Sequence, residues 1–457
     1  MKNLNDSSSR RNFLRQASKL GALAGAPFAA NLLAMGAAGA QQASDYKALV
    51  CIYLSGGNDQ SNTIVPISAA EYDLYAKGRG SLALPISALQ QISPTGWTGP
   101  TLAMHGSLSG LKSVFDQGKL AVLANVGTLC APTTQAQYKN GSATLPFQLF
   151  SHSDQAGAWQ TGLPDRASST GWMGRIGDLT NSAFNTGSGV SIAMSVAGNN
   201  LTQVGNDTIQ YQVTTNGAVK VNALGGLFNY SAAGATALRR LMTEQRTGTL
   251  MEGELNKVSS RAIATESLVT TALSGVSLST PFPTTDIGKQ LQMVARLIGA
   301  RGGLAQKRQI FYVQMGGYDF HADLVNGQAA KLKDLSDAMT AFYQATVAMG
   351  VSGNVTSFTA SDFGRALQSN GQGADHGWGG HHFVMGDAVL GNRIYGRFPT
   401  VSLGSPDDAG QGRLIPTTSV DEYAATLASW FGVPASDLST VVPNIGRFSK
   451  PNLGFLA

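Results

Sequence analysis

The chain has 457 residues, of which 13% are charged, and a formal net charge of +5. Five basic residues and one acidic residue among positions 1–40 supply +4 of this charge, which leaves about +1 for the remainder. A nearly neutral remainder argues against a nucleic-acid-binding protein. The length suits one large α/β enzyme domain with insertions, and the 55 glycines favour many tight turns over a helical bundle.

The first forty residues have the features of an export signal. Positions 9–15 read SRRNFLR, the twin-arginine pattern, and a mildly apolar run follows to Ala38. The small residues Ala38, Gly39 and Ala40 then suit a signal peptidase. We expect residues 1–40 to engage the twin-arginine export machinery and to deliver the mature chain to the periplasm or the exterior. An uncleaved anchor or a basic amphipathic helix is the alternative.

Residues 41–457 are expected to form one α/β domain without a transmembrane segment, because no later apolar run could span a bilayer. Buried strands alternate with helices along this part of the chain, which predicts a mostly parallel sheet with helices on both faces. The predicted strands are 47–54, 119–126, 309–315 and 355–360, and the predicted helices are 107–117 and 323–349.

The middle of the chain has a different pattern. Residues 185–225 alternate apolar and polar side chains between turn residues, which predicts short antiparallel strands. Residues 232–273 have a helical pattern and 274–283 a loop composition. We interpret the segment 185–280 as a possible lid or side subdomain.

The two cysteines, Cys51 and Cys130, cannot form a thiolate zinc site. Cys51 lies in a predicted strand, where a buried thiol is the usual outcome. A disulfide between the two is the alternative in an oxidising compartment.

Three acids follow predicted strands. Asp59, Asp319 and Asp362 each lie in the loop after a strand. In an α/β sheet ligands bind beyond the carboxyl ends of the strands. The three carboxylates are therefore expected to reach the same edge of the sheet, as a metal site requires.

Five of the six histidines fall in four short motifs together with these acids. The motifs are SGGND at 55–59, FSHSDQ at 150–155, GGYDFH at 316–321, and SDFGR at 361–365 continuing to DHGWGGHH at 375–382. On a strand His381 and His382 would point to opposite faces, so at most one is expected to be a ligand. The sixth, His105, is interpreted as structural, near a helix start.

Carboxylates and imidazoles together suit zinc, manganese or a similar divalent ion, whereas carboxylates alone would indicate magnesium or calcium. Such an ion can polarise an ester and activate a nucleophile, and two ions can stabilise both ends of a displacement. Each motif alone is also compatible with an ordinary turn or helix cap. The coincidence of all four favours a functional site. The candidate ligands are Asp59, Asp319, His321, Asp362, Asp375 and His376.

Ser151 precedes a predicted helix, whose free N–H groups favour an anion such as phosphate or sulfate. Arg365 could add a bidentate contact to the same anion, and a plain N-cap is the alternative for Ser151. The chain lacks a Gly-x-Ser-x-Gly elbow, a Walker loop and a dinucleotide fingerprint. These absences argue against a serine esterase, an NTPase and a dehydrogenase.

The twin-arginine leader and the ordered motifs resemble a bacterial exported family known as domain of unknown function 1501, over essentially the whole mature chain. That family looks related to the alkaline phosphatase and sulfatase superfamily. The resemblance implies a three-layer α/β/α sandwich and a binuclear metal site. The small antiparallel and helical insertion is predicted from the pattern of residues 185–280.

The resemblance also implies roles for single residues. Asp59 would bind one metal, Asp319 with His321 would bind the other, and Asp362 matches the late aspartate of the superfamily's metal site. Ser151 would be the nucleophile, with His152 as an adjacent ligand or base.

The chain departs from the pattern in two places. Phe363 stands where the superfamily commonly has a histidine, and the Asp375-His376 pair is the candidate to supply that imidazole. Phe150 stands where the family often has an arginine.

The leading hypothesis is an exported metal-dependent hydrolase of a phosphate, sulfate or related ester, with zinc, manganese or calcium as the cofactor. Its partner would be a small anionic ester or an anionic glycan. The alternative is a non-catalytic exported or surface-associated protein that uses a degenerate hydrolase-like site for binding or assembly.

Overall fold

The computed structural model describes residues 46–225, 231–245 and 248–457. The predicted signal peptide lies outside these residues. The main sheet has ten strands, mostly parallel in its centre. In spatial order they are β14 (Arg393–Tyr395), β5 (Leu120–Gly127), β13 (Gly380–Met385), β10 (Val355–Ser361), β1 (Lys47–Leu54), β9 (Arg308–Met315), β6 (Ala193–Ser195), β7 (Tyr211–Thr214) and β8 (Gly217–Ala218), with β15 (Thr418–Ser419) beside β5.

The central strand β1 shows why this sheet is buried on both faces. Its side chains alternate strictly between the two large apolar clusters of the domain: Ala48, Val50, Ile52 and Leu54 pack in one, and Leu49, Cys51 and Tyr53 in the other. This is the period-two alternation of a strand whose faces are both covered. The continuous apolar run in the sequence follows directly from that burial.

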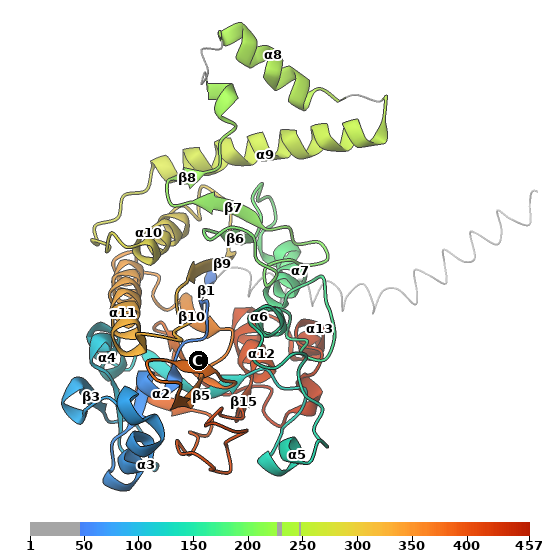
Figure 1. The fold of residues 1–457 in the computed structure, drawn as a ribbon. Helices are drawn as coiled ribbons and strands as arrows, with labels where there is room; N and C mark the ends of the chain where they lie inside the picture. Colours follow the sequence, from blue (N-terminus) through green and yellow to red (C-terminus); the bar gives the residue numbers. More distant parts are fainter. Residues whose placement is uncertain (1–45, 226–230, 246–247) are drawn as a thin grey trace, which may run out of the picture. The chain divides into compact units, whose positions relative to one another are not determined.

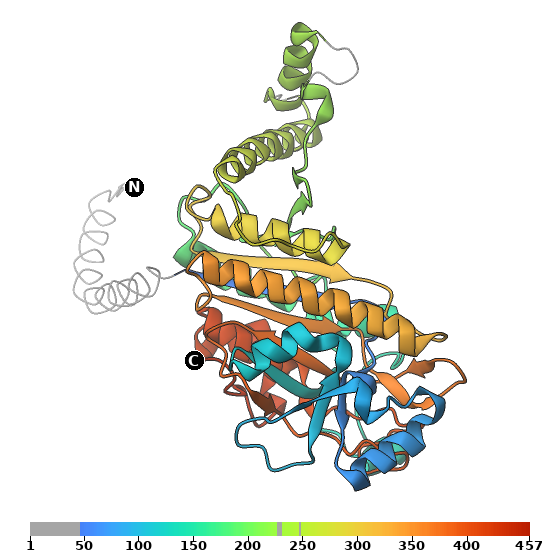
Figure 2. The ribbon, with the colours of Figure 1, turned by 90° about the vertical axis from the view of Figure 1, so that its left-hand side faces the viewer.

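Helices cover each face, which confirms the three-layer α/β/α prediction (Figures 1 and 2). One layer contains α4 (Ser109–Asp116), α10 (Asp286–Gly299) and α11 (Leu324–Ala348). The other contains α6 (His152–Thr161), α7 (Trp172–Phe184), α12 (Val420–Phe431) and α13 (Leu438–Val441). None of the helices in the described residues is long and apolar enough to cross a membrane.

Two smaller sheets and several short helices complete the domain. One small sheet has the order β2 (Ile64–Pro66), β4 (Leu102–His105), β3 (Leu89–Ile92), and the other pairs β11 (Arg365–Ser369) with β12 (Ala374–His376). The remaining α-helices here are α2 (Gln60–Thr63), α3 (Ala69–Arg79) and α5 (Gln135–Lys139). Short 3-10 helices are η1 (Gly80–Leu82), η2 (Ile86–Ala88), η3 (Gly106–Leu108), η4 (Asn222–Gly225), η6 (Ala435–Asp437) and η7 (Ile445–Arg447).

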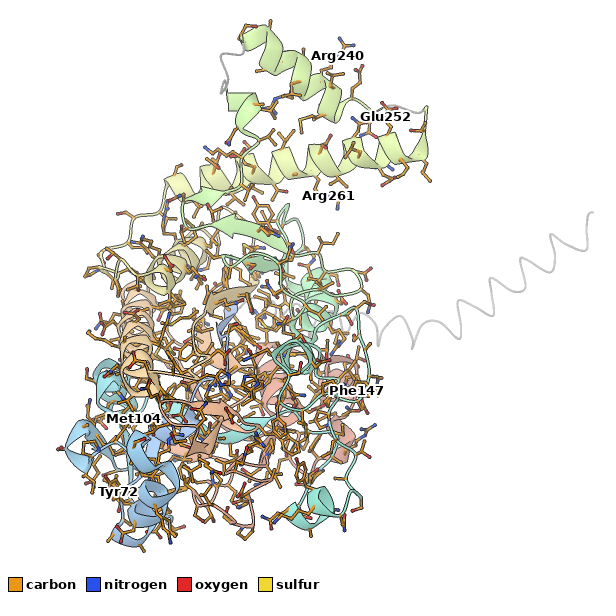
Figure 3. All side chains as sticks on the ribbon, viewed as in Figure 1. Tyr72, Met104, Phe147, Arg240, Glu252 and Arg261 are labelled. Atoms are coloured by element: carbon orange, nitrogen blue, oxygen red, sulfur yellow. The ribbon has the colours of Figure 1, made fainter. Side chains whose placement is uncertain are left out.

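The middle segment differs in part from its prediction. The pair β7–β8 is antiparallel, as expected, but β6 and β7 are parallel members of the main sheet. Two helices follow, α8 (Ala232–Thr243) and α9 (Leu250–Ser274), from which Arg240, Glu252 and Arg261 project (Figure 3). The contacts of the site described below come from other segments, so a lid role for 185–280 stays a prediction.

Cys51 and Cys130 are both buried free thiols. Burial raises the pKa of the Cys130 thiol to about 11. The prediction of a buried thiol at Cys51 is therefore confirmed, and the alternative, a disulfide with Cys130, is not formed.

His105 is structural, as expected. It ends β4 and caps η3, where its Nδ1 accepts a hydrogen bond from the Ser107 N–H at 3.0 Å.

Candidate metal centre

The strand ends bring two of the three predicted acids together. In β1, Leu54 lies opposite Met315 of β9 on one side and Ser361 of β10 on the other, so the three strands end in register. Asp362 follows β10 directly, and Asp319 lies in the turn after β9. Both carboxylates thus reach the carboxyl edge of the sheet, where α/β folds bind ligands.

Three imidazoles converge on the Asp319 carboxylate. Its Oδ1 lies 3.3 Å from Nε2 of His152, 3.1 Å from Nε2 of His321 and 3.4 Å from Nε2 of His376. The His321 and His376 Nε2 atoms are themselves 3.0 Å apart. We call these four residues the histidine cluster. Within it, donor atoms of His152, Asp319 and His376 all lie within 4.8 Å of one another.

Different elements deliver the cluster. His152 is the first residue of α6, and His376 ends β12. His321 lies two residues beyond Asp319 in the loop between β9 and α11. The ring of Phe363 lies against two of the imidazoles, with centroid distances of 4.7 Å to His152 and 4.8 Å to His376. The Phe363 ring thus packs against the imidazoles and helps to fix their positions.

The other ring nitrogens are held by oxygens. His152 Nδ1 is 2.7 Å from Asp362 Oδ2, and His376 Nδ1 is 2.6 Å from the carbonyl oxygen of Phe150. A carbonyl can only accept, so His376 carries its proton on Nδ1 and, when neutral, presents a lone pair on Nε2. His321 Nδ1 faces Asp375 Oδ1 at 3.4 Å. Metal-binding histidines are usually oriented by such outer partners.

The cluster's charges are tuned by these contacts. The hydrogen bond with Asp362 raises the pKa of His152, against the effect of burial. Burial lowers the pKa of His376. Burial alone would raise the pKa of Asp319, but the hydrogen bond and charge of Arg365 outweigh it and lower that pKa. The cluster therefore offers an ionised carboxylate beside an imidazole that favours its neutral form.

Three observations fit a bound divalent ion. His152 Nε2 and Asp362 Oδ1 are buried and make no hydrogen bond within the described residues. The facing Nε2 atoms of His321 and His376 need a proton or a cation between them. The separations of 3.0–3.4 Å between Asp319 Oδ1 and the three Nε2 atoms, and between the Nε2 atoms of His321 and His376, are close to the roughly 3.3 Å between neighbouring ligand atoms around an ion with ligand bonds of about 2.0–2.1 Å.

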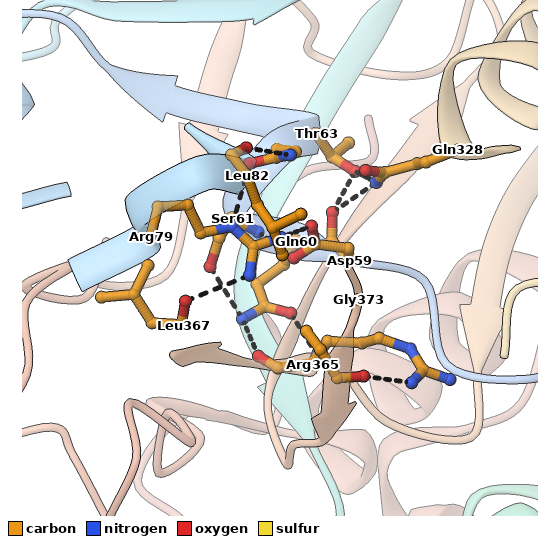
Figure 4. Close-up of polar contacts among 12 residues, drawn as sticks. Asp59, Gln60, Ser61, Thr63, Arg79, Leu82, Gln328, Arg365, Leu367 and Gly373 are labelled. Carbon is orange, nitrogen blue, oxygen red and sulfur yellow. Dashed lines mark hydrogen bonds and ion pairs between the residues drawn. The ribbon is translucent and has the colours of Figure 1, made fainter. Parts of the chain in front are cut away.

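Asp59 is placed differently from its prediction. Its side chain is fully buried at the start of α2, where Oδ1 accepts a hydrogen bond from the Ser61 N–H and Oδ2 forms an ion pair with Arg79 (Figure 4). Both carboxylate oxygens are therefore engaged away from the histidine cluster. Sequence reasoning missed Arg79, which lies twenty residues farther along in α3.

Arg365 is also placed differently. Its guanidinium has no exposed side-chain surface. It donates to the carbonyl oxygens of Gly57, Ala374 and Gly56, and it contacts Asp319 Oδ1. Arg365 was predicted to bind an anionic ligand through its guanidinium. In the structure the guanidinium is buried and contacts the Asp319 carboxylate instead.

Two predicted ligands, Asp362 and Asp375, lie behind imidazoles. Asp362 is only 4% exposed, and its Oδ2 accepts from the Gly56 N–H at 3.1 Å as well as facing His152. Asp375 accepts from Asn370 Nδ2 at 3.1 Å and faces His321. Both are therefore outer partners here.

Ser151 is the N-cap residue of α6, but its hydroxyl makes no capping hydrogen bond. The hydroxyl donates instead to Asp154 Oδ2 at 2.6 Å. The first N–H groups of α6 thus lack a side-chain cap from Ser151, beside the cluster's His152. This is a position that favours an anion.

The contacts of His381 and His382 are with residues outside the cluster. On β13, His381 Nδ1 accepts from the Asn125 N–H at 3.0 Å, and His382 packs against the ring of Trp159. Burial lowers the pKa of each to about 3. Both are neutral core residues.

Comparisons with known proteins give one family and several distant folds. No curated protein matches the chain. Similar solved structures include Ps i-CgsB in complex with k-i-k-neocarrahexaose, at 8% identity and a TM-score of 0.34 over 89% of this chain and 77% of that one. The PsFucS1 sulfatase from Pseudoalteromonas sp. has 8% identity and a TM-score of 0.34, over 87% and 70%.

An alkaline phosphatase, PafA, in mutant form, has 13% identity and a TM-score of 0.26, covering 70% of this chain and 64% of its own. The family assignment rests on the family model, which is described as a protein of unknown function and matches residues 46–436. The chain therefore belongs to the family DUF1501.

Proposed function

We propose that this protein is an exported metal-dependent hydrolase of a phosphate, sulfate or related anionic ester, with the histidine cluster as its metal site. One observation carries the proposal: three imidazole Nε2 atoms surround a carboxylate oxygen at 3.1–3.4 Å. Nitrogen and oxygen donors in this mixture suit zinc or manganese better than calcium.

His152, Asp319 and His376 would hold the ion, and His321 lies next to Asp319 and His376. A bound ion would supply Lewis-acid polarisation of the ester and a lowered pKa for a coordinated nucleophile. The chain's own residues prepare the site. Asp362 and the Phe150 carbonyl keep the His152 and His376 Nδ1 protons in place, so that Nε2 of each imidazole faces Asp319.

Ser151 is the candidate nucleophile, and the N-terminus of α6 is the candidate binding site for the anionic group of the ester. The uncapped N–H groups of α6 suit the anionic group of the ester. Asp154 Oδ2 accepts a hydrogen bond from the Ser151 hydroxyl at 2.6 Å, which is where a base that activates a serine must lie. Ser151 thus stays the candidate nucleophile, with Asp154 rather than His152 beside its hydroxyl.

The test compares Asp319→Ala and His376→Ala with the wild-type protein. Each removes a donor at the centre, so metal affinity should fall by more than the roughly 10–100-fold typical of losing an outer partner, and the metal retained by the purified protein should fall with it. Turnover of aryl phosphate or aryl sulfate, with zinc, manganese or calcium supplied, should fall with it. Asp337→Ala is the matched control, because Asp337 pairs with Lys333 on the surface of α11 and should bind metal normally.

Metal content is measured by plasma mass spectrometry on protein recovered from the periplasmic fraction, where a mature chain beginning after Ala40 is expected. Wild-type protein that binds no metal would contradict the proposal. Metal binding without turnover of any tested ester would instead favour the non-catalytic binding role.

A further inference from the structure

Two buried arginines lie beside the acids from which a two-metal centre would be built. Arg79 and Asp59 form an ion pair in which neither side chain is exposed. Arg79 also donates to Asn62 Oδ1 at 3.1 Å and to the Ala366 carbonyl at 2.9 Å. Burial raises the pKa of Asp59, and Arg79 opposes that shift. The carboxylate therefore has a cation of its own, supplied by the protein.

Arg365 supplies the second fixed cation. Three backbone carbonyls, those of Gly56, Gly57 and Ala374, hold its guanidinium at 2.6–3.0 Å while it contacts Asp319. An arginine guanidinium stays charged at all physiological pH values. A permanent positive charge thus lies in contact with the carboxylate expected to bind one of the two ions.

We infer that the centre holds a single metal ion, and that the guanidinium groups of Arg79 and Arg365 take the electrostatic place of a second one. The inference rests on the proposed function, and it corrects the binuclear site that the family resemblance implied. In two-metal sites the ions lie about 3.5–4 Å apart, and each needs its own set of donors.

Two of the acids expected at a second ion, Asp59 and Asp362, are already engaged. Asp59 uses one oxygen for Arg79 and the other for the Ser61 N–H. Asp362 uses Oδ2 for His152 and Gly56 and leaves only Oδ1 without a hydrogen bond. The one free oxygen of Asp362 and the carboxylate of Asp375, which already accepts from Asn370 and faces His321, do not supply a separate set of donors for a second divalent ion.

The decisive experiment counts metal in the wild-type protein. Protein saturated with zinc, and separately with manganese, is dialysed and analysed for bound metal per chain. Anomalous scattering from a crystal of the loaded protein then locates the ions. One equivalent per chain is expected, with a single peak among His152, Asp319 and His376. Two equivalents overturn the single-ion inference and leave the proposed function standing, whereas zero equivalents overturn both.

A pair of variants tests the part assigned to Arg79. Arg79→Met frees the Asp59 carboxylate and should raise the metal content of the folded protein above one equivalent. Arg79→Lys keeps the charge and should stay at one. Equal metal content in the two folded variants would overturn the role of the guanidinium. Circular dichroism checks folding, and if Arg79→Met unfolds, the wild-type count still decides the number of ions.

Discussion

Single residues in the histidine cluster depend on partners that have no signature in the sequence. Asp319, His321 and His376 were predicted as neighbours because they follow strands or share a motif. The acceptor that orients His376 is the backbone carbonyl of Phe150, and any residue type has one. Phe150 also adopts a left-handed φ of 73°, which a phenylalanine rarely does.

Asp59 was predicted to be a metal ligand, but in the structure its carboxylate pairs with Arg79. It follows a predicted strand in the same way as Asp362, so the pattern gave it the same role. What separates the two is Arg79, whose helix folds back to bury an ion pair. Since that contact depends on how α3 packs, it could not be inferred from the spacing of the acids.

Asp421 yields a pH prediction. It lies in the first turn of α12, is 1% exposed, and has an Oδ1 without a hydrogen-bond partner in the described residues. Burial, with a smaller effect of Glu422, raises its pKa to about 8. In the unfolded chain an aspartate has a pKa of about 3.9. The folded state therefore keeps a proton that the unfolded state has lost between these two pH values.

The free energy of unfolding should accordingly fall as pH rises from 5 to 8, by up to about 4 kcal/mol from this group. Asp421→Asn cannot ionise and should lack this part of the slope. Urea unfolding at pH 5, 6, 7 and 8 measures both proteins. Parallel curves for the two would show that Asp421 is already ionised in the folded state.

Whole elements were predicted more accurately than single contacts. The strands expected at 119–126, 309–315 and 355–360 are found at Leu120–Gly127, Arg308–Met315 and Val355–Ser361. Strands buried on both faces give long apolar runs, which are easy to recognise. The three-residue strands β2 and β6 are too short to show any period, so the small sheet and the parallel pairing of β6 were missed.

Gly373, in the turn between β11 and β12, tests how these elements support the cluster. A Cβ at this position would overlap the backbone of Phe320 and His321. Gly373→Ala should therefore displace the loop that carries Asp319 and His321. We expect a loss of about 1–3 kcal/mol in stability, together with weaker metal binding.

Gly157→Ala is the matched control. It lies on α6, the helix that carries His152, and a Cβ there would meet no atom within 4 Å. Alanine should stabilise this helix by about 0.5–1 kcal/mol and leave metal binding unchanged. Thermal unfolding and a competitive metal titration compare the two variants. Equal metal affinity in both would mean that the contact at Gly373 does not position the cluster.

At the scale of the whole molecule, the order of strands and helices was sufficient to predict a parallel sheet covered on both faces. The reason is physical: a continuous apolar strand must be buried on both sides, and the intervening helices are the only segments long enough to cover it. The sheet also buries polar residues, among them two histidines on β13. Because these histidines are buried, the stability of the domain should fall at acidic pH.

His381 and His382, on β13, are 2% and 3% exposed, and burial lowers the pKa of each to about 3. In the unfolded chain a histidine has a pKa of about 6.5. Below pH 6.5 the unfolded state therefore binds protons that the folded state does not. Between pH 7 and pH 5 each histidine should lower the free energy of unfolding by about 2 kcal/mol.

His381→Asn isolates this effect from the other histidines. Its amide oxygen can still accept the Asn125 N–H that His381 Nδ1 accepts at 3.0 Å, so the variant should fold. The variant should be less stable than the wild type at pH 7, because it loses the ring that stacks on Phe398 at 4.9 Å. That deficit should shrink by about 2 kcal/mol at pH 5, since asparagine does not titrate. Urea unfolding of both proteins at the two pH values, with metal removed by a chelator, measures the difference. A deficit that is the same at both pH values would mean that His381 is protonated in the folded protein, against the burial that the sheet imposes.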